Sequence, residues 1–161
     1  LVDTDPDPVK QWLQFQNLGN AEINGLELEL NGTFKNGNKG YINFAYQHSK
    51  DKETKEELIN VPKLAGNIGI SIPIIRDKVY ASLEGHYVGK RLTKEEGIAV
   101  DPYFIANLTL LSKNLFRNLE ISASIYNLFN EEYEDPAGEE HLQVKIPRNG
   151  RNFLIKSSYQ F

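Results

Sequence analysis

The sequence predicts an all-β fold, an antiparallel up-and-down sheet of about seven strands that is part of a transmembrane β-barrel. Three observations predict it. Apolar and polar residues alternate with period two in segment after segment, the connections between segments alternate between short and long, and most segments are long enough to cross a membrane as tilted strands. No apolar run approaches the roughly 18 residues of a membrane-spanning helix, so strands would have to make any crossing.

The alternation separates two faces in each segment in turn. In residues 26–34, Leu26, Leu28 and Leu30 share one face, whereas Glu27 and Glu29 lie on the other. The pattern is weaker in the second and fifth segments. The predicted strands are residues 26–34, 41–48, 64–74, 79–90, 103–111, 119–129 and 152–161. Most have roughly 9 to 14 residues, which exceeds the globular mean of about 5 to 6 and suits a tilted crossing of about 9 to 11.

The polar face of the predicted sheet contains carboxylates, at Glu27, Glu29, Glu84 and Glu120. Unpaired carboxylates are costly in a dry core, so we expect this face to line a lumen filled by water or protein. The alternative is a soluble sheet whose polar face meets bulk water. Average hydropathy does not separate the two, because a barrel strand shows lipid only every second side chain.

The connections sort by length. Residues 35–38 contain an Asn-Gly pair typical of a tight turn, Arg76-Asp77 is predicted as a two-residue hairpin turn, and residues 114–118 are brief. The long polar connections are residues 49–61, 91–102 and 131–150. Short turns at one end of the strands and long loops at the other are typical of outer-membrane barrels.

Composition excludes several classes of function. The 161 residues carry 18 Lys and Arg against 22 Asp and Glu, a formal charge of −4 without a basic stretch, which argues against nucleic-acid binding. Cys is absent, so disulfides, thiolate metal sites and cysteine nucleophiles are excluded. The sequence contains no nucleophile elbow, phosphate-binding loop or dinucleotide fingerprint. We therefore expect no catalytic residues, no resident metal and no cofactor, and hence no enzyme.

One acidic cluster leaves a metal site open as an alternative. It comprises Glu134, Asp135, Glu139, Glu140 and His141, and carboxylates suit a hard cation such as Ca²⁺. The histidines of the chain are dispersed and show no metal-ligand spacing. A solvated acidic loop is the favoured interpretation of this cluster.

Motifs near the C-terminus occur in a specific order. An Asn-Leu-Phe segment followed by a Tyr ends the penultimate strand, a Gly-Arg pair opens the last strand, and an aromatic residue ends the chain. These residues are Asn127, Leu128, Phe129, Tyr133, Gly150, Arg151 and Phe161. In this order they resemble the closing strands of TonB-dependent outer-membrane receptors. Residues 17–29 and 60–62 are similar to further segments of that family, so the resemblance covers essentially the whole chain.

The resemblance implies that residues 1–161 are the C-terminal portion, about the last third, of a barrel of about 22 strands. The chain begins at Leu1 and contains no Met, and we predict a piece of a longer or processed protein whose N-terminal plug and TonB box lie upstream. The short turns would then be periplasmic and the long loops outward-facing. The last strand also resembles the signal read by the barrel-assembly machinery. Its side chains are Phe153, Ile155, Tyr159 and Phe161.

The function implied by the resemblance is active import across the bacterial outer membrane. The expected ligand is a scarce nutrient chelate, foremost a ferric siderophore. The expected partners are outer-membrane lipid, the barrel-assembly machinery, the TonB complex through the N-terminal part, and the small chelate, with no nucleic acid. Because many such ligands are anionic, charge would steer them to loop cations. The candidate ligand-binding residues are Lys90, Arg91, Lys94 and Arg148.

Two further interpretations stay open at this point. A small closed barrel of about eight strands would anchor or adhere without transporting anything, and it needs at least one more strand upstream of Leu1. A soluble carbohydrate- or lipid-binding β-domain predicts a monomer that stays in solution without detergent. Both membrane interpretations instead predict aggregation or dependence on detergent.

Overall fold

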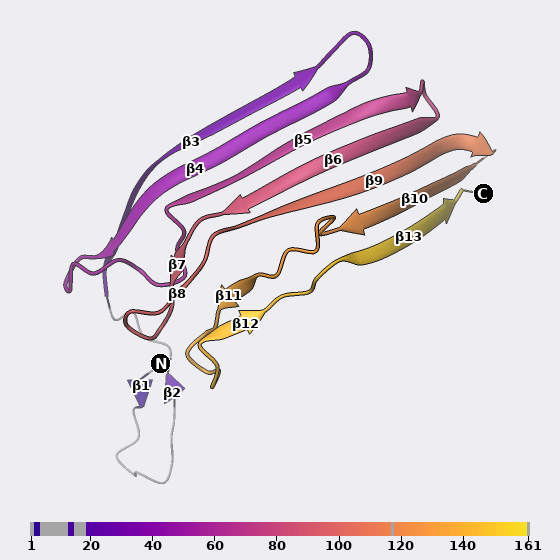
Figure 1. Ribbon diagram of the computed structural model, residues 1–161. Coiled ribbons are helices and arrows are strands. Elements are labelled where there is room, and N and C mark those ends of the chain that lie inside the picture. Colours follow the sequence, from indigo (N-terminus) through magenta and orange to yellow (C-terminus); the bar gives the residue numbers. More distant parts are fainter. Residues whose placement is uncertain (1, 4–12, 15–18, 117, 161) are drawn as a thin grey trace.

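A computed structural model describes residues 2–3, 13–14, 19–116 and 118–160. Its main feature is one antiparallel sheet of seven long strands, joined in chain order (Figure 1), which confirms the predicted all-β, up-and-down architecture. The strands are β3 (Ala21–Thr33), β4 (Lys39–Asp51), β5 (Leu64–Ile75), β6 (Val79–Val88), β9 (Tyr103–Phe116), β10 (Leu119–Tyr126) and β13 (Asn152–Tyr159). Within the described part of the chain, no helix is long and apolar enough to cross a membrane.

Three small two-stranded hairpins accompany the sheet. They pair β1 (Val2–Asp3) with β2 (Leu13–Gln14), β7 (Arg91–Leu92) with β8 (Ala99–Val100), and β11 (Glu134–Pro136) with β12 (Lys145–Pro147). The second and third hairpins lie inside connections that the sequence predicts only as polar loops. These two connections therefore have hydrogen-bonded structure of their own.

Cross-strand register aligns apolar side chains in rows on one face of the sheet. In one row, Leu30 pairs with Ile42 and Ile42 with Ile68, and the row continues through Gly85 and Ala106. The large side chains of this face are exposed, with Leu30 at 56 % and Ile68 at 52 %. Because water would not favour so much exposed apolar surface on a folded domain, the face is suited to lipid.

The opposite face is polar in the same register. Asn43, Asn67 and His86 pair across β4, β5 and β6. Asn67 Nδ2 donates to Asn43 Oδ1 at 2.9 Å, and the His86 ring contacts Asn67 Oδ1. Ser82 Oγ donates to Ser71 Oγ at 2.9 Å further along the same face. These neighbouring side chains of the polar face therefore satisfy one another's hydrogen-bonding groups across the strands.

The connections sort by length as predicted, with the short turns at one end of the sheet and the long connections at the other (Figure 1). In the turn after β3, Phe34 N donates to the Asn38 oxygen at 2.9 Å, and Gly37 takes a φ of 89°. The prediction of a two-residue turn after β5 is wrong. Residues 76–78 form a three-residue turn because Asp77 takes a φ of 61° and Lys78 N donates to the Ile75 oxygen at 2.9 Å.

Several strand limits also differ from the predictions. β3 begins at Ala21 and β9 continues to Phe116, because pairing with the neighbouring strands extends beyond the clearly alternating residues. β6 ends at Val88 and β10 at Tyr126, both earlier than predicted. β10 ends early because Asn127, with a φ of 52°, turns the chain out of the strand.

Buried apolar side chains gather at the loop end of the polar face. Val88, Tyr103 and Ile105 form a cluster there, and the partly buried Tyr133 from the last long connection packs against it. By contrast, all residues of β13 are exposed. β3 and β13 are the two edges of an open sheet, so both edges are free to pair with further strands.

Candidate ligand-binding site at the loop end of the sheet

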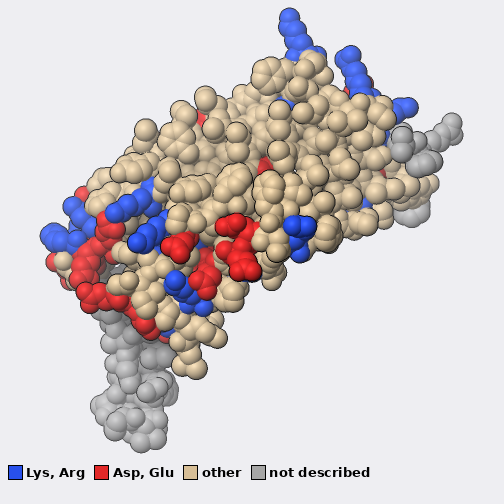
Figure 2. All heavy atoms as spheres, in the orientation of Figure 1, with Lys and Arg blue, Asp and Glu red and all other residues tan. Residues whose placement is uncertain are grey.

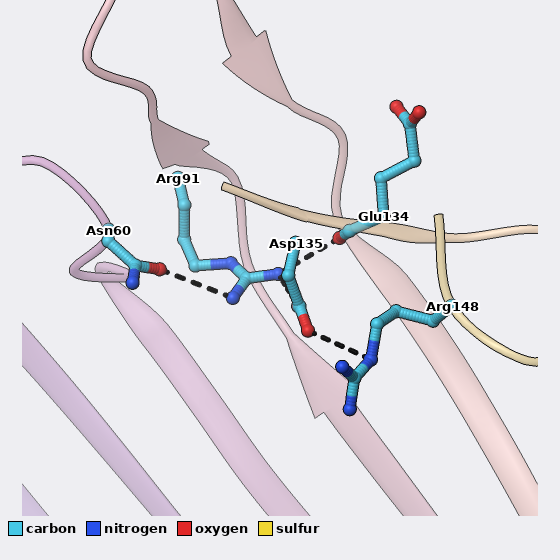
Figure 3. A network of polar contacts seen from close by, with 5 residues as sticks. All are labelled: Asn60, Arg91, Glu134, Asp135 and Arg148. Atoms are coloured by element: carbon cyan, nitrogen blue, oxygen red, sulfur yellow. Dashed lines mark hydrogen bonds and ion pairs between the residues drawn. The ribbon is translucent and has the colours of Figure 1, made fainter. Parts of the chain in front are cut away.

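The three long connections, residues 52–63, 89–102 and 127–151, meet in one polar network (Figure 3). The first connection contributes Asn60 and the second contributes Arg91. The third contributes Glu134, Asp135 and Arg148. These residues therefore join segments that are far apart in sequence into one unit.

Arg91 is the centre of the network. Its Nη2 donates to Asp135 Oδ1 at 2.6 Å and to the Glu134 main-chain oxygen at 3.1 Å, and its Nη1 donates to Asn60 Oδ1 at 3.4 Å. The residue is only 9 % exposed, and its guanidinium carbon lies 5.7 Å from the centroid of the Tyr103 ring. Nε is buried and finds no hydrogen-bond partner among the described residues. Because a buried cation needs a paired anion, Asp135 is the essential partner of Arg91.

Asp135 lies between two arginines. Oδ1 accepts from Arg91, while Oδ2 lies 3.1 Å from Arg148 Nε. The Arg148 side chain is 54 % exposed, and its terminal nitrogens make no hydrogen bond or ion pair within the described chain. Arginine binds carboxylates and phosphates through such terminal nitrogens. Asp135 thus positions Arg148 through Nε, while the terminal nitrogens of Arg148 can still donate to an anion.

The two predicted lysines lie in different surroundings. Lys94 Nζ donates to the Gly138 oxygen at 3.3 Å and also to the main-chain oxygen of His141, which connects it to the tip of the β11–β12 hairpin. Lys90 is exposed, and its side chain has no partner in the described part of the chain. The structure therefore brings Arg91 and Lys94 into contact with the connection 127–151, which itself contains Arg148, and Lys90 stands apart from it.

The Asn-Leu-Phe motif forms a turn closed by its own side chain. Asn127 is 3 % exposed. Its Oδ1 accepts from Glu131 N at 2.8 Å, and its Nδ2 donates to the Glu131 oxygen at 2.8 Å. Asn107 Oδ1 accepts from Asn127 N at 3.0 Å, and Leu128 N donates to the Ala106 oxygen at 2.7 Å. Asn tolerates the left-handed backbone conformation and supplies both a donor and an acceptor, so the local geometry calls for this residue type.

The Gly-Arg motif meets the same turn from the start of the last strand. Asn130 Oδ1 accepts from Arg151 N at 2.8 Å, and a Cβ added to Gly150 would lie 2.7 Å from that oxygen. Glycine therefore leaves room for the contact. Tyr133, the aromatic residue of the motif, packs on Tyr103 with ring centroids 4.5 Å apart. Asn127 and Tyr133 thus join the last connection to β9, and the Asn130–Arg151 contact joins the two ends of that connection.

The remaining motif residues lie on the apolar side. Phe129, Phe153, Ile155 and Tyr159 are exposed there, Phe129 to 68 % and Ile155 to 78 %. Phe161, the last residue of the predicted assembly signal, lies outside the described residues.

Sequence reasoning missed part of the network. Asn60 and Tyr103 were not predicted as site residues, and Asp135 was grouped with an acidic cluster that could hold a cation. Asp135 instead serves two arginines, and no group of three His, Cys, Asp or Glu in the described chain could hold a metal ion. The Glu-Asp-Pro segment at residues 134–136 could have indicated the partner of Arg91 from the sequence. An arginine that becomes buried requires a carboxylate partner.

Comparison with known proteins identifies the fold family. Residues 1–128 match the family model described as TonB dependent receptor-like, beta-barrel. The chain is 26 % identical over 153 residues to heme/hemopexin utilization protein C of Haemophilus influenzae, an alignment that covers 92 % of this chain and 20 % of that protein. The chain therefore spans about a fifth of the length of the curated relatives that it matches.

Solved structures agree in fold. The ferric citrate transporter FecA in its unliganded form matches with a TM-score of 0.78 at 14 % identity, covering 89 % of this chain and 25 % of that one. The ferric yersiniabactin uptake receptor FyuA from Yersinia pestis matches with a TM-score of 0.76 at 20 % identity, covering 89 % and 24 %. The chain therefore belongs to the TonB-dependent receptor-like β-barrel family, and its seven long strands form an open part of such a barrel.

Proposed function

We propose that residues 1–161 are the C-terminal portion of a Gram-negative outer-membrane receptor that imports a scarce nutrient chelate with energy supplied through TonB. The supporting observation is that Arg91 joins all three long connections, which gives the outward mouth a preorganised wall. The loops capture the ligand, a plug upstream of this chain closes the lumen, and the TonB complex acts on that upstream part to release the ligand inward. No covalent chemistry is involved.

In this proposal the four loop cations have two roles. Arg148 and Lys90 are exposed and have donors without partners among the described residues, so they contact the anionic ligand directly, and Lys94 adds positive charge at the tip of the β11–β12 hairpin. Arg91 is buried and acts through the loops that it positions. Exposed charges at the rim of a binding surface mainly raise the association rate, and salt screens their effect.

The ligand that we propose first is a ferric siderophore, and the second candidate is haem. Structures of the same fold include receptors named for ferric chelates, such as ferric citrate and ferric yersiniabactin. The curated relatives are named for heme/hemopexin utilization, and haem carries propionate carboxylates that suit an arginine such as Arg148. With either ligand as the iron source, growth under iron starvation would depend on the receptor.

A growth experiment separates the two ligands. The full receptor is expressed in an iron-starved Gram-negative strain that lacks its own iron receptors, with a ferric siderophore or haem as the only iron source. We expect growth on one of the two sources, and we expect it to vanish when TonB is deleted. Growth on neither source, or growth without TonB, would contradict the proposed import function.

A binding experiment tests the site. In the full receptor, R148S combined with K90S should lower the association rate for the ligand that supports growth by about tenfold at low salt, with a smaller effect at high salt. K52S is the matched control because Lys52 is an exposed loop cation outside the network. Equal rates for R148S/K90S and K52S would remove both residues from the site.

The predicted assembly signal is a separate part of the proposal. Phe153, Ile155 and Tyr159 present an apolar surface at a free sheet edge, as a segment recognised by the barrel-assembly machinery would. Removing Phe161 from the full receptor should lower its level in the outer membrane, measured by membrane fractionation. An unchanged level would exclude a role for that residue in assembly.

A further inference from the structure

The short-turn end of the sheet is basic, in contrast to the rest of the chain. Residues 35–39, 76–78 and 113–120 together contain six Lys and Arg against two Asp and Glu, a net charge of +4. The whole chain has a net charge of −4, so the remaining residues carry −8. Figure 2 shows basic side chains projecting from this end of the molecule. Positive charge is therefore concentrated at the end that the family resemblance predicts to be periplasmic.

A pocket lies on the polar face of the sheet beside these turns. Lys39 and Ser71 pair across β4 and β5, four residues along their strands from the polar-face pair Asn43 and Asn67, so their side chains point to the same face. Two adjacent cross-strand rows of this face line the pocket, and they contain Lys39, Ser71 and Ser82, then Pro73, Tyr80 and Leu111. The polar face therefore supplies the floor of the pocket.

The turn after β3 closes one side of the pocket. A Cβ added to Gly37 in that turn would lie 3.3 Å from Pro73 Cγ, so the turn packs closely on β5. The cavity that results has a volume of about 390 Å³. A cavity of this size suits a small ligand, so we consider a small molecule rather than a protein segment as its occupant.

Four cations line the pocket, and they come from different elements. Lys35 lies in the turn after β3, Lys39 begins β4, Arg76 lies in the turn after β5, and Lys113 lies near the end of β9. Asp77 is the only carboxylate among the described residues that line the pocket. A cleft lined by charges of one sign concentrates the opposite sign, so the pocket favours an anion.

These cations have weak partners or none. Arg76 Nε lies 3.8 Å from Asp77 Oδ2, and both side chains are more than four-fifths exposed. Lys113 Nζ lies 3.9 Å from Glu120 Oε2, and both side chains are about half exposed. The other two cations are exposed lysines whose side chains have no partner within the described chain. Because exposed pairs of this kind contribute little, an incoming anion can replace the two carboxylates.

Hydroxyl groups on the floor add neutral donors to these charges. Ser82 Oγ donates to Ser71 Oγ at 2.9 Å, so one hydroxyl hydrogen of the pair is still available. The Tyr80 hydroxyl has no partner within the described chain. Glu84, in the row beyond Ser82, accepts instead from the Tyr41 hydroxyl at 3.3 Å. Carboxylates and phosphates accept from hydroxyl, ammonium and guanidinium groups alike, so their oxygens match the donors of this pocket.

We propose that this pocket binds a small polyanion that carries at least two carboxylate or phosphate groups. A ligand with two or more such groups can contact cations of different elements at once, whereas a single group neutralises fewer of them. The pocket is thus a second anion site, at the opposite end of the polar face from Arg148. Its use by an anionic nutrient on the way inward rests on the proposed function, whereas the binding itself does not.

Acetylation of lysines in the full receptor tests the site, with citrate and pyrophosphate as the probes. The modification is followed residue by residue with mass spectrometry, at low salt and in metal-free buffer. Well above its Kd, at least one probe should slow acetylation of Lys35, Lys39 and Lys113 by about fivefold or more, because a bound polyanion protects the lysines that it contacts. Slowing by citrate, by pyrophosphate or by both shows whether carboxylates, phosphates or either group binds.

Lys78 is the matched control within the same protein. It is exposed in the same turn as Arg76 but does not line the pocket, so its acetylation should change by less than about twofold. No slowing of the pocket lysines by either probe would overturn the proposal. Equal slowing at Lys78 would also overturn it, because the probes would then respond only to the general charge of this end.

Two variants test the contribution of one pocket cation. R76Q should raise the probe concentration that half-protects Lys39 and Lys113 by about tenfold, because it removes a charge-assisted contact. K78Q removes a neighbouring cation outside the pocket and should leave that concentration unchanged. Equal values for the two variants would overturn the assignment. The protection is local to the short-turn end and requires neither growth nor TonB, so its failure is distinguishable from failure of the proposed import function.

Discussion

Arg91 and Asn127 each satisfy several polar groups in the long connections. Arg91 serves a carboxylate, a main-chain oxygen and an amide oxygen. Asn127 donates to and accepts from the main chain of Glu131. Both residues are buried, so each lost contact would leave a polar group unpaired away from water. The stability of the loop end therefore depends on a few side chains.

The Arg91 network predicts a local loss of stability when the arginine is replaced. R91M in the full receptor should destabilise the closed arrangement of the connection 127–151 by about 3 to 5 kcal/mol, because it leaves Asp135 partly buried with only one cation. Hydrogen exchange of that connection measures the effect. R76M is the matched control, because the exposed Arg76–Asp77 pair should contribute at most about 1 kcal/mol. Equal exchange in both variants would contradict the role given to Arg91.

The Asn127 turn predicts different effects of two substitutions. N127A loses the contacts with Glu131 and must also place a Cβ residue at a φ of 52°, so we expect a cost of about 2 to 4 kcal/mol. N127G loses the same contacts but tolerates the backbone conformation, so it should cost about 1 kcal/mol less. Thermal unfolding of the two receptor variants measures the difference. A larger loss in N127G would show that backbone strain is not part of the effect.

At the scale of strands, tight contacts on the polar face come from pairing a large residue with a glycine. Tyr41 on β4 pairs with Gly69 on β5, and a Cβ added to Gly69 would lie 2.2 Å from Tyr41 Cε1. The Tyr41 hydroxyl continues across the next strand and donates to Glu84 Oε1 at 3.3 Å. The tyrosine ring thus covers the glycine and connects three strands.

This strand pair predicts strong coupling between two substitutions. G69A should destabilise the receptor by about 1 to 3 kcal/mol, because it forces the Tyr41 ring to move. In a Y41S background the same substitution should cost much less, since the obstructing ring is gone. The unfolding free energies of the two single variants and the double variant form the required cycle. Additive costs would mean that Tyr41 does not cover Gly69.

At the scale of the whole molecule, the sheet has two free edges and one exposed apolar face. β3 and β13 have a hydrogen-bonded neighbour on one side only. Hydrocarbon does not tolerate unpaired main-chain groups, and water does not favour a large exposed apolar face. Neither water nor hydrocarbon therefore suits the open sheet alone, whereas pairing with further strands in a closed barrel would satisfy both edges.

These edges predict the behaviour of residues 1–161 on their own. Expressed alone, the chain should aggregate in detergent-free buffer, because the exposed edges and apolar face associate between copies. Size-exclusion chromatography with light scattering measures the state, and the full receptor in detergent, expected to be monodisperse, is the control. A soluble monomer would favour the soluble β-domain that the sequence left open.

Part of the candidate site could be predicted from the sequence, and part could not. Lys94 and Arg148 were predicted from charge and loop position; Lys94 contacts the last long connection, and Arg148 lies in it beside Asp135. Arg91 was predicted by the same reasoning, yet it is buried among residues up to 44 positions away along the chain. Charge and spacing do not reveal which cation becomes buried, because burial depends on how three connections fold against one another.

By itself the sequence determined the strands, the order of the sheet and the ends at which short and long connections lie. Period-two alternation and turn chemistry are local, and each strand pairs with the next long strand along the chain, so few topologies were available. Only the tertiary structure decided that Arg91 holds the loops, that Asn127 ends β10, and that the Tyr41 ring covers Gly69. These features arise from contacts between distant segments and from cross-strand register, which alternation within a single strand does not specify.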